Sequence, residues 1–500
     1  MSTPSQGSPV IVDIGSAYVK VGFAGETDPT YIFPCITGKR KYKSVMVDAG
    51  TQMQDVYVGD AAMKLRGVLN LNHPIQRSAI TDWDEYYEIL NHAFYTLLRI
   101  NNTQNHPIIY IESISEQQDI REYIARVLFE THQFHSILMI PSPILSSFSV
   151  GLTTALVIES GDGITWIVPI INGQIIYRAI QRLDLAGIDI NHNLESLLMR
   201  EGITISSSGS SEIIRQIKEE YCYFVLDPDN PGKLGEKVEY PLPDGSMIEI
   251  PPHILFKAPE VMFDPSMIGS NSPSLPEAII KCLESIEKPY WGDLLTHIVL
   301  SGGNFLHTGF KERLETELNS LLSQYGPIPK AHKIETEKQV KILQSVKSAK
   351  KLQDNCPECG ALVDLSDGKT QCPECGASLE TTQIDIQIKD SAPLKCPLCN
   401  KVIDDKTSLF CPYCGHKLRE DKIEISTASN QVPETHEYFD SSSKILHFYI
   451  PNNLQTAIYN GASILGSLPS FNQLFITQAE FQENREIISR DISEIFSFQS

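Results

Sequence analysis

Two stretches of the chain repeat one pattern of apolar and polar positions. Each has an apolar run, a short polar turn that contains glycine, and a second apolar run, and they occupy residues 10–25 and 156–173. Apolar runs on both sides of such a turn are typical of a β-hairpin. The pattern therefore predicts two similar hairpins, one in each half of the chain.

Strand and helix patterns alternate after each hairpin. Strands are predicted at 108–111, 137–140 and 296–300, and helices at 116–131, 211–224 and 309–322. Such alternation indicates an α/β fold, a sheet with helices packed on it. A further helix is predicted at 83–99, where apolar residues recur at helical spacing. Its apolar stripe, which we expect in the core, comprises Trp83, Tyr86, Tyr87, Leu90, Phe94, Leu97 and Leu98.

The two turns have the composition of a phosphate site. Gly15 and Ser16 occupy the first turn, and Gly161 and Gly163 the second. Turn glycines let backbone amides point at an anion, because no Cβ blocks the approach. Two such turns facing each other across a cleft would hold a polyphosphate between them. Lys20 follows the first turn at a distance that lets its ammonium reach a phosphate.

Carboxylates flank both turns. Asp13 stands two residues before Gly15, Glu159 stands two residues before Gly161, and Asp162 follows directly. Magnesium prefers oxygen ligands and usually keeps several of its waters. We therefore expect Asp13, Glu159 and Asp162 to hold a magnesium ion beside the phosphates.

Composition limits the class of protein. A chain of 500 residues exceeds what one core fills, and a hydrophobic fraction of 41% with 21% charged residues is that of an ordinary globular protein. The net charge of −21 disfavours attraction to nucleic acid or anionic lipid. No apolar run approaches the roughly 20 residues of a membrane span, and the N-terminus lacks a signal pattern. We expect a cytoplasmic protein that binds neither membranes nor nucleic acid.

The eleven cysteines fall into two groups. Cys35, Cys222 and Cys282 are isolated and are expected to be small buried hydrophobes. The others form four Cys-Pro-x-Cys pairs, and a cytoplasmic location favours metal binding over disulfides. These paired cysteines are Cys356, Cys359, Cys372, Cys375, Cys396, Cys399, Cys411 and Cys414.

The spacing of the paired cysteines predicts two zinc sites. Twelve residues separate Cys359 from Cys372 and eleven separate Cys399 from Cys411, which suits two tetrahedral four-thiolate sites. Four sulfur ligands leave no open position, so the two zinc ions are expected to be structural; redox-active iron is the alternative. From residue 350 to 424 there are 10 Lys plus Arg against 13 Asp plus Glu, which favours a protein partner or a steric role over nucleic acid.

Residues 13–25, Asp-Ile-Gly-Ser-Ala-Tyr-Val-Lys-Val-Gly-Phe-Ala-Gly, resemble the first phosphate loop of actin. The resemblance continues through the motifs at 57–61, 81–84, 160–163, 183–187, 300–303 and 461–465. It implies a duplicated, ribonuclease-H-like fold of two lobes around a central nucleotide cleft that takes ATP or ADP with magnesium.

The same resemblance implies domain boundaries. The first lobe would span 8–150, with an outer loop at about 40–67 that is either a filament contact or a plain solvent loop, and the second lobe would span 151–326. An insertion at 327–444 would hold a helical stalk at 334–352 and a double zinc ribbon, 356–376 and 396–416. The actin-like pattern resumes over 445–500.

The resemblance also assigns site residues. Lys218 and Glu219 match positions that reach the nucleotide's sugar, although a charged helical face is often simply solvated. At the base, His307 replaces a stacking aromatic residue and Gln455 replaces a lysine. The nucleotide-binding residues implied in this way are Asp13, Gly15, Ser16, Lys20, Glu159, Gly161, Asp162, Gly163, Gly187, Lys218, Glu219, Gly303 and Asn304.

Two positions bear on hydrolysis. Ser142 stands where the family has a glutamine, and Trp166 stands where it has a histidine, and both of those residues help hold the attacking water. Glu159 also replaces an aspartate. Loss of a positioned water or base typically costs about 10²- to 10⁴-fold in rate, or roughly 3 to 5 kcal/mol of barrier. We therefore expect nucleotide binding with slow hydrolysis.

The function expected is that of an actin-related, ATP-binding cytoskeletal protein whose partners are actin or other actin-related subunits. By resemblance the insertion lies near the surface that meets the next subunit of a filament, so we predict that conventional filaments do not form from this chain alone. The alternatives are a scaffold subunit of a larger complex and a small-molecule kinase. Residues resembling the groove that receives helices of actin regulators, or else core, are Phe148, Gly151, Thr153, Ile464, Leu465, Leu468 and Leu474.

Overall fold

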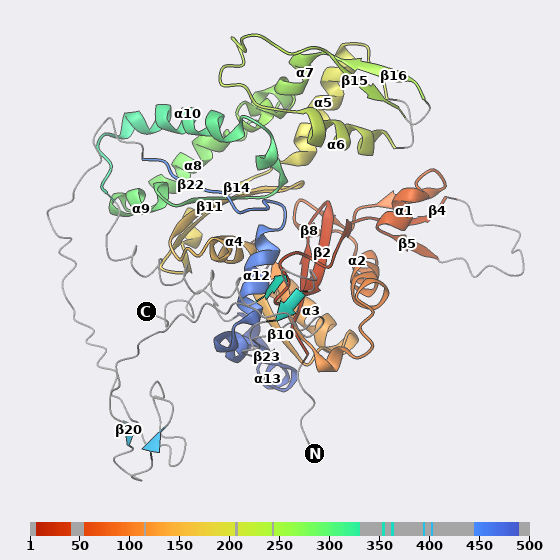
Figure 1. The fold of residues 1–500 in the computed structure, drawn as a ribbon, viewed down its shortest axis with the longest axis vertical. Coiled ribbons are helices and arrows are strands. Elements are labelled where there is room, and N and C mark those ends of the chain that lie inside the picture. Colours follow the sequence, from red (N-terminus) through yellow and green to blue (C-terminus); the bar gives the residue numbers. More distant parts are fainter. Residues whose placement is uncertain are drawn as a thin grey trace, which may run out of the picture. The chain divides into compact units, whose positions relative to one another are not determined.

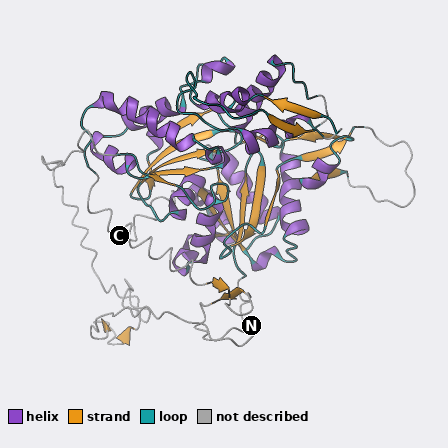
Figure 2. Cartoon of the chain, turned by 45° about the horizontal axis from the view of Figure 1, so that its top comes forward, coloured by secondary structure: helices purple, strands orange, loops and turns teal. Residues whose placement is uncertain are grey.

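The computed structural model describes residues 7–41, 55–114, 117–205, 209–242, 245–330 and 445–489, together with four short strands between 353 and 403. The chain divides into two compact units, residues 1–351 with 437–500 and residues 352–436. The first unit contains two lobes, each built on one six-stranded sheet (Figure 1). Helices flank the strands of both sheets (Figure 2).

The first-lobe sheet has the strand order β23-β10-β9-β1-β2-β3. Its strands are β1 (Val10–Ile14), β2 (Tyr18–Phe23), β3 (Tyr31–Pro34), β9 (Pro107–Glu112), β10 (Ser136–Pro141) and β23 (Ile476–Thr477). Strands β1 and β2 form an antiparallel hairpin, and β1, β9 and β10 run parallel. The predicted first hairpin and both strands that follow it are confirmed.

The second-lobe sheet repeats this plan. Its strands are β11 (Ala155–Ser160), β12 (Thr165–Ile171), β13 (Gln174–Ile175), β14 (Gln181–Leu183), β17 (Ile298–Ser301) and β22 (Phe448–Tyr449). Strands β11 and β12 form the second predicted hairpin, and β11, β17 and β22 run parallel. The duplicated α/β fold is therefore confirmed, and the segment that follows the insertion supplies one strand to each sheet.

The first-lobe helices are α1 (Asp60–Lys64), α2 (Trp83–Asn91), α3 (Gln118–Arg126), α4 (Ser142–Ser149), α12 (Ala457–Ser467) and α13 (Gln478–Glu483). Helices α2 and α3 each continue into a π-helix, at His92–Leu97 and Val127–Thr131. The predicted helices at 83–99 and 116–131 therefore exist, but their last turns are wider than an α-helix, a change that the apolar spacing did not reveal.

Smaller strands complete this lobe. Strands β4 (Thr37–Arg40), β5 (Val56–Val58) and β6 (Leu69–Asn72) form a three-stranded sheet beside α1, and β7 (Ile75–Gln76) pairs with β8 (Ala79–Ile80). Of the outer loop predicted at about 40–67, residues 42–54 lie outside the described residues, and the rest contains β5 and α1.

The second-lobe helices are α5 (Gly187–Arg200), α6 (Ser210–Tyr221), α7 (Pro252–Lys257), α8 (Leu275–Glu284), α9 (Trp291–Leu295) and α10 (Phe310–Leu322), and β15 (Val238–Pro241) pairs with β16 (Met247–Ile250). Helix α6 ends three residues before the prediction, because Cys222 adopts an extended backbone with ψ 144°. Strand β17 starts two residues late, because Thr296 still caps α9.

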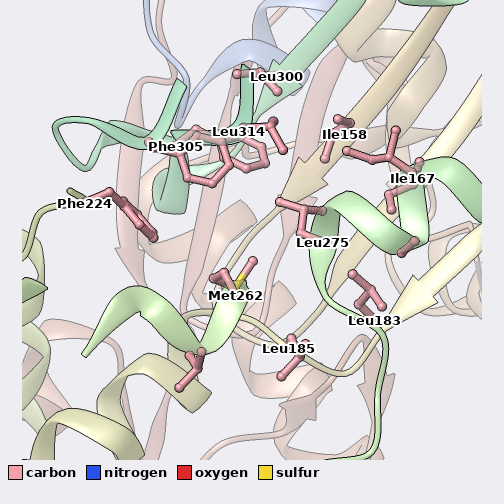
Figure 3. Packing of buried hydrophobic residues seen from close by; sticks show 14 of the residues in the cluster. Ile158, Ile167, Leu183, Leu185, Phe224, Met262, Leu275, Leu300, Phe305 and Leu314 are labelled. Carbon is pink, nitrogen blue, oxygen red and sulfur yellow. The ribbon is translucent and has the colours of Figure 1, made fainter. Parts of the chain in front are cut away.

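Three large apolar clusters form the core of the first unit, together with a small fourth one of Ile36, Ala62 and Leu69. One lies in each lobe, and Figure 3 shows part of the second-lobe cluster, where Leu275 of α8 and Leu314 of α10 lie over strand residues such as Ile158. The predicted stripe of residues 83–98 belongs to the first-lobe cluster or packs against it, as expected. Cys35, Cys222 and Cys282 are buried and free, and burial raises the pKa of each thiol to about 12.

The third cluster joins the lobes. It contains Ile11 from the first sheet and Val157 from the second, with α4 and α12 packed between the sheets (Figure 1). A Cβ on Gly461 of α12 would lie only 2.0 Å from the carbonyl oxygen of Leu145 on α4. Glycine therefore permits the close approach of these two helices, which fixes the base of the cleft.

The residues that the structure describes in the second unit form two short antiparallel strand pairs. Strand β18 (Gln353–Asn355) pairs with β19 (Leu362–Asp364), and β20 (Leu394–Lys395) pairs with β21 (Val402–Ile403). In the sequence, the Cys-Pro-x-Cys pairs at 356–359 and 396–399 lie between the strands of each pair. All eight paired cysteines and the predicted stalk at 334–352 lie outside the described residues.

Within the described part of the chain, none of the helices combines the length and the apolar character that crossing a lipid bilayer requires.

Candidate functional site

A cavity of about 500 Å³ lies between the lobes of the first unit, within the size range of small-molecule sites. Both hairpin turns line it, together with side chains of α6 and of the segment after β17. The sequence-predicted residues that it brings together are Asp13, Gly15, Ser16, Lys20, Ser142, Glu159, Gly161, Asp162, Gly163, Trp166, Lys218, Glu219, Gly303 and Asn304. Gly187 lies directly behind them, where a Cβ would meet the Lys218 ammonium.

The two turns are built alike. The Gly15 amide donates to the Tyr18 carbonyl at 3.0 Å, and the Gly161 amide donates to the Ile164 carbonyl at 3.2 Å. Each hairpin therefore closes with a four-residue turn that starts on glycine. The turns also face each other, because a Cβ on Gly163 would lie 2.6 Å from the Ser16 hydroxyl oxygen.

Hydrogen bonds from other segments of the chain hold the second turn in place. The Asn304 amide donates to the Ser160 hydroxyl at 2.9 Å and to the Gly161 carbonyl at 2.7 Å. The Gly187 amide donates to the same Gly161 carbonyl at 3.0 Å. Gly302 must be glycine, because its φ is +109° and a Cβ would lie 2.2 Å from the Ser160 carbonyl oxygen.

Open space remains on the cavity side of two glycines. No heavy atom lies within 4 Å of a Cβ built on Gly161, and a Cβ on Gly303 would meet only the Gln455 amide nitrogen, at 3.9 Å. Bare backbone beside open space is what a polyphosphate approaching backbone amides needs. The residues present therefore fit a phosphorylated ligand.

Two lysines supply positive charge to the cavity. The Lys20 ammonium lies 2.7 Å from Asp13, and the Lys218 ammonium lies 3.2 Å from the Gly187 carbonyl and 3.9 Å from Asp162. Lys218 is only 4% exposed, and this burial lowers the pKa of its ammonium. An anion in the cavity would favour its charged form.

Glu159 is buried beneath the turns, with both carboxylate oxygens engaged. The Ser142 hydroxyl donates to one oxygen at 2.6 Å, and the Ser146 hydroxyl donates to the other. Burial raises the pKa of Glu159 to about 7, and the nearby charge of Asp13 adds to the effect. The hydroxyl proton of Ser142 is thus already used in the hydrogen bond to Glu159.

Trp166 stands directly opposite Glu159 in the β11–β12 register. Its ring is 8% exposed and lines the cavity, and the Arg182 guanidinium lies 5.7 Å from the ring centroid. The indole N–H has no hydrogen-bond partner among the described residues. An indole N–H donates only, and this one is buried, so Trp166 supplies no base to the cavity.

His307 and Gln455 line another part of the cavity. The His307 Nδ1 lies 3.1 Å from the Cys222 carbonyl oxygen, which accepts only, so Nδ1 carries the proton and Nε2 is an acceptor. Burial, assisted by the charge of Lys218, lowers the pKa of His307 to about 4. The imidazole is therefore neutral at physiological pH.

Sequence reasoning missed Arg77, which joins the lobes. Its guanidinium donates to both carboxylate oxygens of Asp189, at 2.8 and 3.2 Å, and to the carbonyls of Gly163 and Asp184. Arg77 and Ser78 form a two-residue turn with positive φ of 46° and 62°. Such turns usually carry Asn-Gly, so Arg77-Ser78 is not recognisable as a turn from its residues.

Among the described residues, no group of three or more His, Cys, Asp or Glu side chains lies close enough to hold a metal ion. Asp13, Glu159 and Asp162 line one cavity but do not form such a group. A magnesium ion here would depend on phosphate oxygens and water for most of its ligands, which is how magnesium is commonly bound.

Most residues of the predicted regulator groove are buried. Phe148, Ile464, Leu465 and Leu474 belong to the cluster that joins the lobes, and Leu468 packs against it half-exposed. Core packing therefore accounts for four of these side chains.

The fold and the cleft define a duplicated, two-lobed α/β protein whose paired hairpin turns face each other across a ligand-sized cavity. Two family models match the chain: Actin over residues 5–352 and Double zinc ribbon over residues 356–415. The chain belongs to the actin family, and its sequence carries a double zinc ribbon between two segments that belong to the first unit. Residues 445–489 lie beyond the matched ranges, yet their strands β22 and β23 complete the two sheets.

Proposed function

We propose that this protein binds ATP or ADP with magnesium in the cleft between its lobes, as an actin-related subunit of the cytoskeleton. The observation that carries the proposal is the pair of matched turns facing each other across a cavity of about 500 Å³. Such paired turns suit the two sides of a polyphosphate chain. The actin family membership supports the same ligand.

We assign different residues to the phosphates and to the base of the ligand. Backbone amides of the two turns bind phosphates, and Lys20 and Lys218 neutralise their charge. Gly303 and Asn304, which line the same cavity, are the residues that we assign to the base and the α-phosphate. The unprotonated Nε2 of His307 suits the exocyclic amino group of adenine, which is a donor.

A bound magnesium ion would neutralise phosphate charge and orient the phosphates. Asp13 and Asp162 are the carboxylates that we assign to it, with phosphate and water oxygens completing its ligands. Glu159 already accepts hydrogen bonds from Ser142 and Ser146.

We further propose that hydrolysis is slow. Ser142 donates its hydroxyl to Glu159, and Trp166 carries no group that accepts a proton. Neither residue therefore orients and deprotonates a water as a glutamine and a histidine would, which costs about 10²- to 10⁴-fold in rate. A phosphate-release assay on the wild type and on Ser142→Gln with Trp166→His tests this, and equal rates would contradict it.

For the insertion, we propose that the eight paired cysteines hold two structural zinc ions and that the ribbons contact protein partners or alter filament assembly. The Double zinc ribbon match supports zinc, and the charge balance of the segment supports a protein partner. A pelleting assay with and without residues 327–444 distinguishes a filament subunit from a scaffold subunit of a larger complex. Ordinary double-stranded filaments of the full chain alone would refute an altered assembly.

Titration calorimetry tests nucleotide binding. Titration of the full chain with ATP and magnesium should release or absorb heat that fits one binding site per chain. Gly161→Val should abolish this binding heat, because the valine side chain fills the open space in the second turn. Gly235→Val is the matched control, because it too has nothing within 4 Å of its Cβ but lies outside the cavity lining. Absence of heat for the wild type would refute the proposed ligand.

A further inference from the structure

Tyr18 occupies the last position of the first turn and lies between two cavities. It lines the cavity of about 500 Å³ and also a second one of about 960 Å³. The second cavity continues between the lobes and is lined by residues of α1 and α6. The Tyr18 side chain therefore forms part of the boundary between the proposed nucleotide site and the outer part of the cleft.

Arg215 reaches Tyr18 from the other lobe. It projects from α6, and its guanidinium carbon lies 5.1 Å from the centroid of the tyrosine ring. Its Nη1 also donates to the Tyr18 hydroxyl. A guanidinium over an aromatic face is attracted by the ring, so two interactions hold this bridge together.

Two carboxylates on α6 fix the guanidinium. Glu212, one turn earlier, accepts from Arg215 Nε at 2.9 Å, and Glu219, one turn later, accepts from Nη1 at 3.0 Å. Glu219 lines the inner cavity, whereas Glu212 and Arg215 line the outer one. The bridge thus shares one ion-pair network with the residue expected to reach the nucleotide's sugar.

We propose that the Tyr18–Arg215 bridge is the gate through which the bound nucleotide exchanges. The lobes cannot separate at this edge of the cleft without withdrawing the guanidinium from the ring and the hydroxyl. Opening the bridge joins the two cavities, while Arg215 and Glu219 stay paired on α6. This inference rests on the proposed nucleotide site, because it concerns how a ligand leaves that site.

The gate is tested by nucleotide exchange in the full chain. The protein is loaded with ATP radiolabelled at its α-phosphate, together with magnesium; excess unlabelled ATP is added, and the label retained on the protein is measured over time. Tyr18→Leu removes ring and hydroxyl and should raise the dissociation rate about tenfold, since a cation–π contact and a hydrogen bond are lost together. Tyr18→Phe keeps the ring and should give a smaller rise.

Controls separate gating from a general loss of structure. Tyr177→Leu, at an exposed tyrosine of the second lobe outside both cavity linings, should leave the dissociation rate unchanged. Arg215→Met combined with Tyr18→Leu should raise the rate no further than the larger single effect, because both changes break one bridge. An unchanged rate in Tyr18→Leu, or fully additive effects, would overturn the gate.

A measurement without nucleotide separates this inference from the proposed function. Hydrogen exchange of the nucleotide-free protein should be faster at residues 15–18 and 210–216 in Tyr18→Leu than in the wild type. If the wild type takes up no labelled ATP, the proposed function fails, and the hydrogen-exchange data alone report whether the bridge holds the lobes. If nucleotide binds but neither rate changes, only the gate is wrong.

Discussion

The first and second turns of the cleft share a local design but differ in their support. Each closes with the same glycine-to-carbonyl hydrogen bond. The second turn is also held by Asn304, by the start of α5 and, at Gly163, by Arg77. At the first turn, the ion pair that we find is local, between Asp13 and Lys20. The second turn is therefore held by several hydrogen bonds from distant residues, whereas the first turn has its own hairpin and the contact of Tyr18 with Arg215.

The two turns therefore have different roles in ligand binding. The braced second turn presents its amides in a fixed geometry before any ligand arrives, which lowers the ordering cost of binding. The first turn depends on the closure of the lobes to meet its counterpart. Substitutions behind the second turn should therefore cost more stability than equivalent changes beside the first.

The largest effect is expected at Gly302. Gly302→Ala places a Cβ against the Ser160 carbonyl and forces an L-residue to φ +109°, so we expect a loss of about 4 kcal/mol from strain and overpacking together. Urea unfolding of the nucleotide-free protein measures it. The neighbouring Gly303→Ala has room for its Cβ and should leave the stability almost unchanged; an equal loss in both variants would contradict the role of the close approach.

Glu159, below the turns, should make stability depend on pH. Its folded-state pKa of about 7 lies above the usual value of 4.5, so its stabilising contribution is complete below pH 4.5 and is lost as the pH rises through 7. Glu159→Gln should therefore be more stable than the wild type at pH 8, by up to about 3 kcal/mol, with the advantage shrinking toward pH 5.

Thermal unfolding of the nucleotide-free, magnesium-free protein at pH 5, 6.5 and 8 measures this trend. Glu249→Gln changes an exposed glutamate of β16 and serves as the control, with no comparable trend expected. A pH-independent difference between Glu159→Gln and the wild type would show that burial does not govern this carboxyl.

Asn304 tests the brace directly. Asn304→Ala removes two hydrogen bonds to the second turn, while Gly161 and Ser160 keep other partners, so we expect a loss of about 2 kcal/mol. Nucleotide affinity should fall with it, as calorimetry can measure. Asn319→Ala, on the exposed side of α10, should change neither quantity; unaltered stability in Asn304→Ala would mean that the second turn holds itself.

The smallest change in stability is expected beside the first turn. Lys20→Met removes the partner of Asp13 and should cost about 1 kcal/mol of stability, because the pair is local and partly accessible. Its effect on nucleotide affinity should be much larger, since a phosphate loses its cation. Lys237→Met breaks an exposed ion pair and should alter neither. A stability loss exceeding that of Asn304→Ala would reverse the comparison between the two turns.

Much of the architecture was already present in the sequence. The hairpins at β1–β2 and β11–β12 follow from apolar runs around glycine turns, and the stripe from Trp83 to Leu98 follows from helical spacing. These signals are local, and burial of an apolar face decides them. The paired cysteines likewise indicated a double zinc ribbon, because ligand spacing is a property of the sequence.

The tertiary structure decided the rest. Arg77 reaches Asp189 and Tyr18 meets Arg215 only because the lobes face each other, and no spacing along the chain links residues so far apart. The return of the chain at β22 and β23 to complete both sheets is also a matter of tertiary pairing. The sequence determined which turns are built for an anion, whereas packing between the lobes determined which turn is rigid, since support from distant residues exists only in the folded chain.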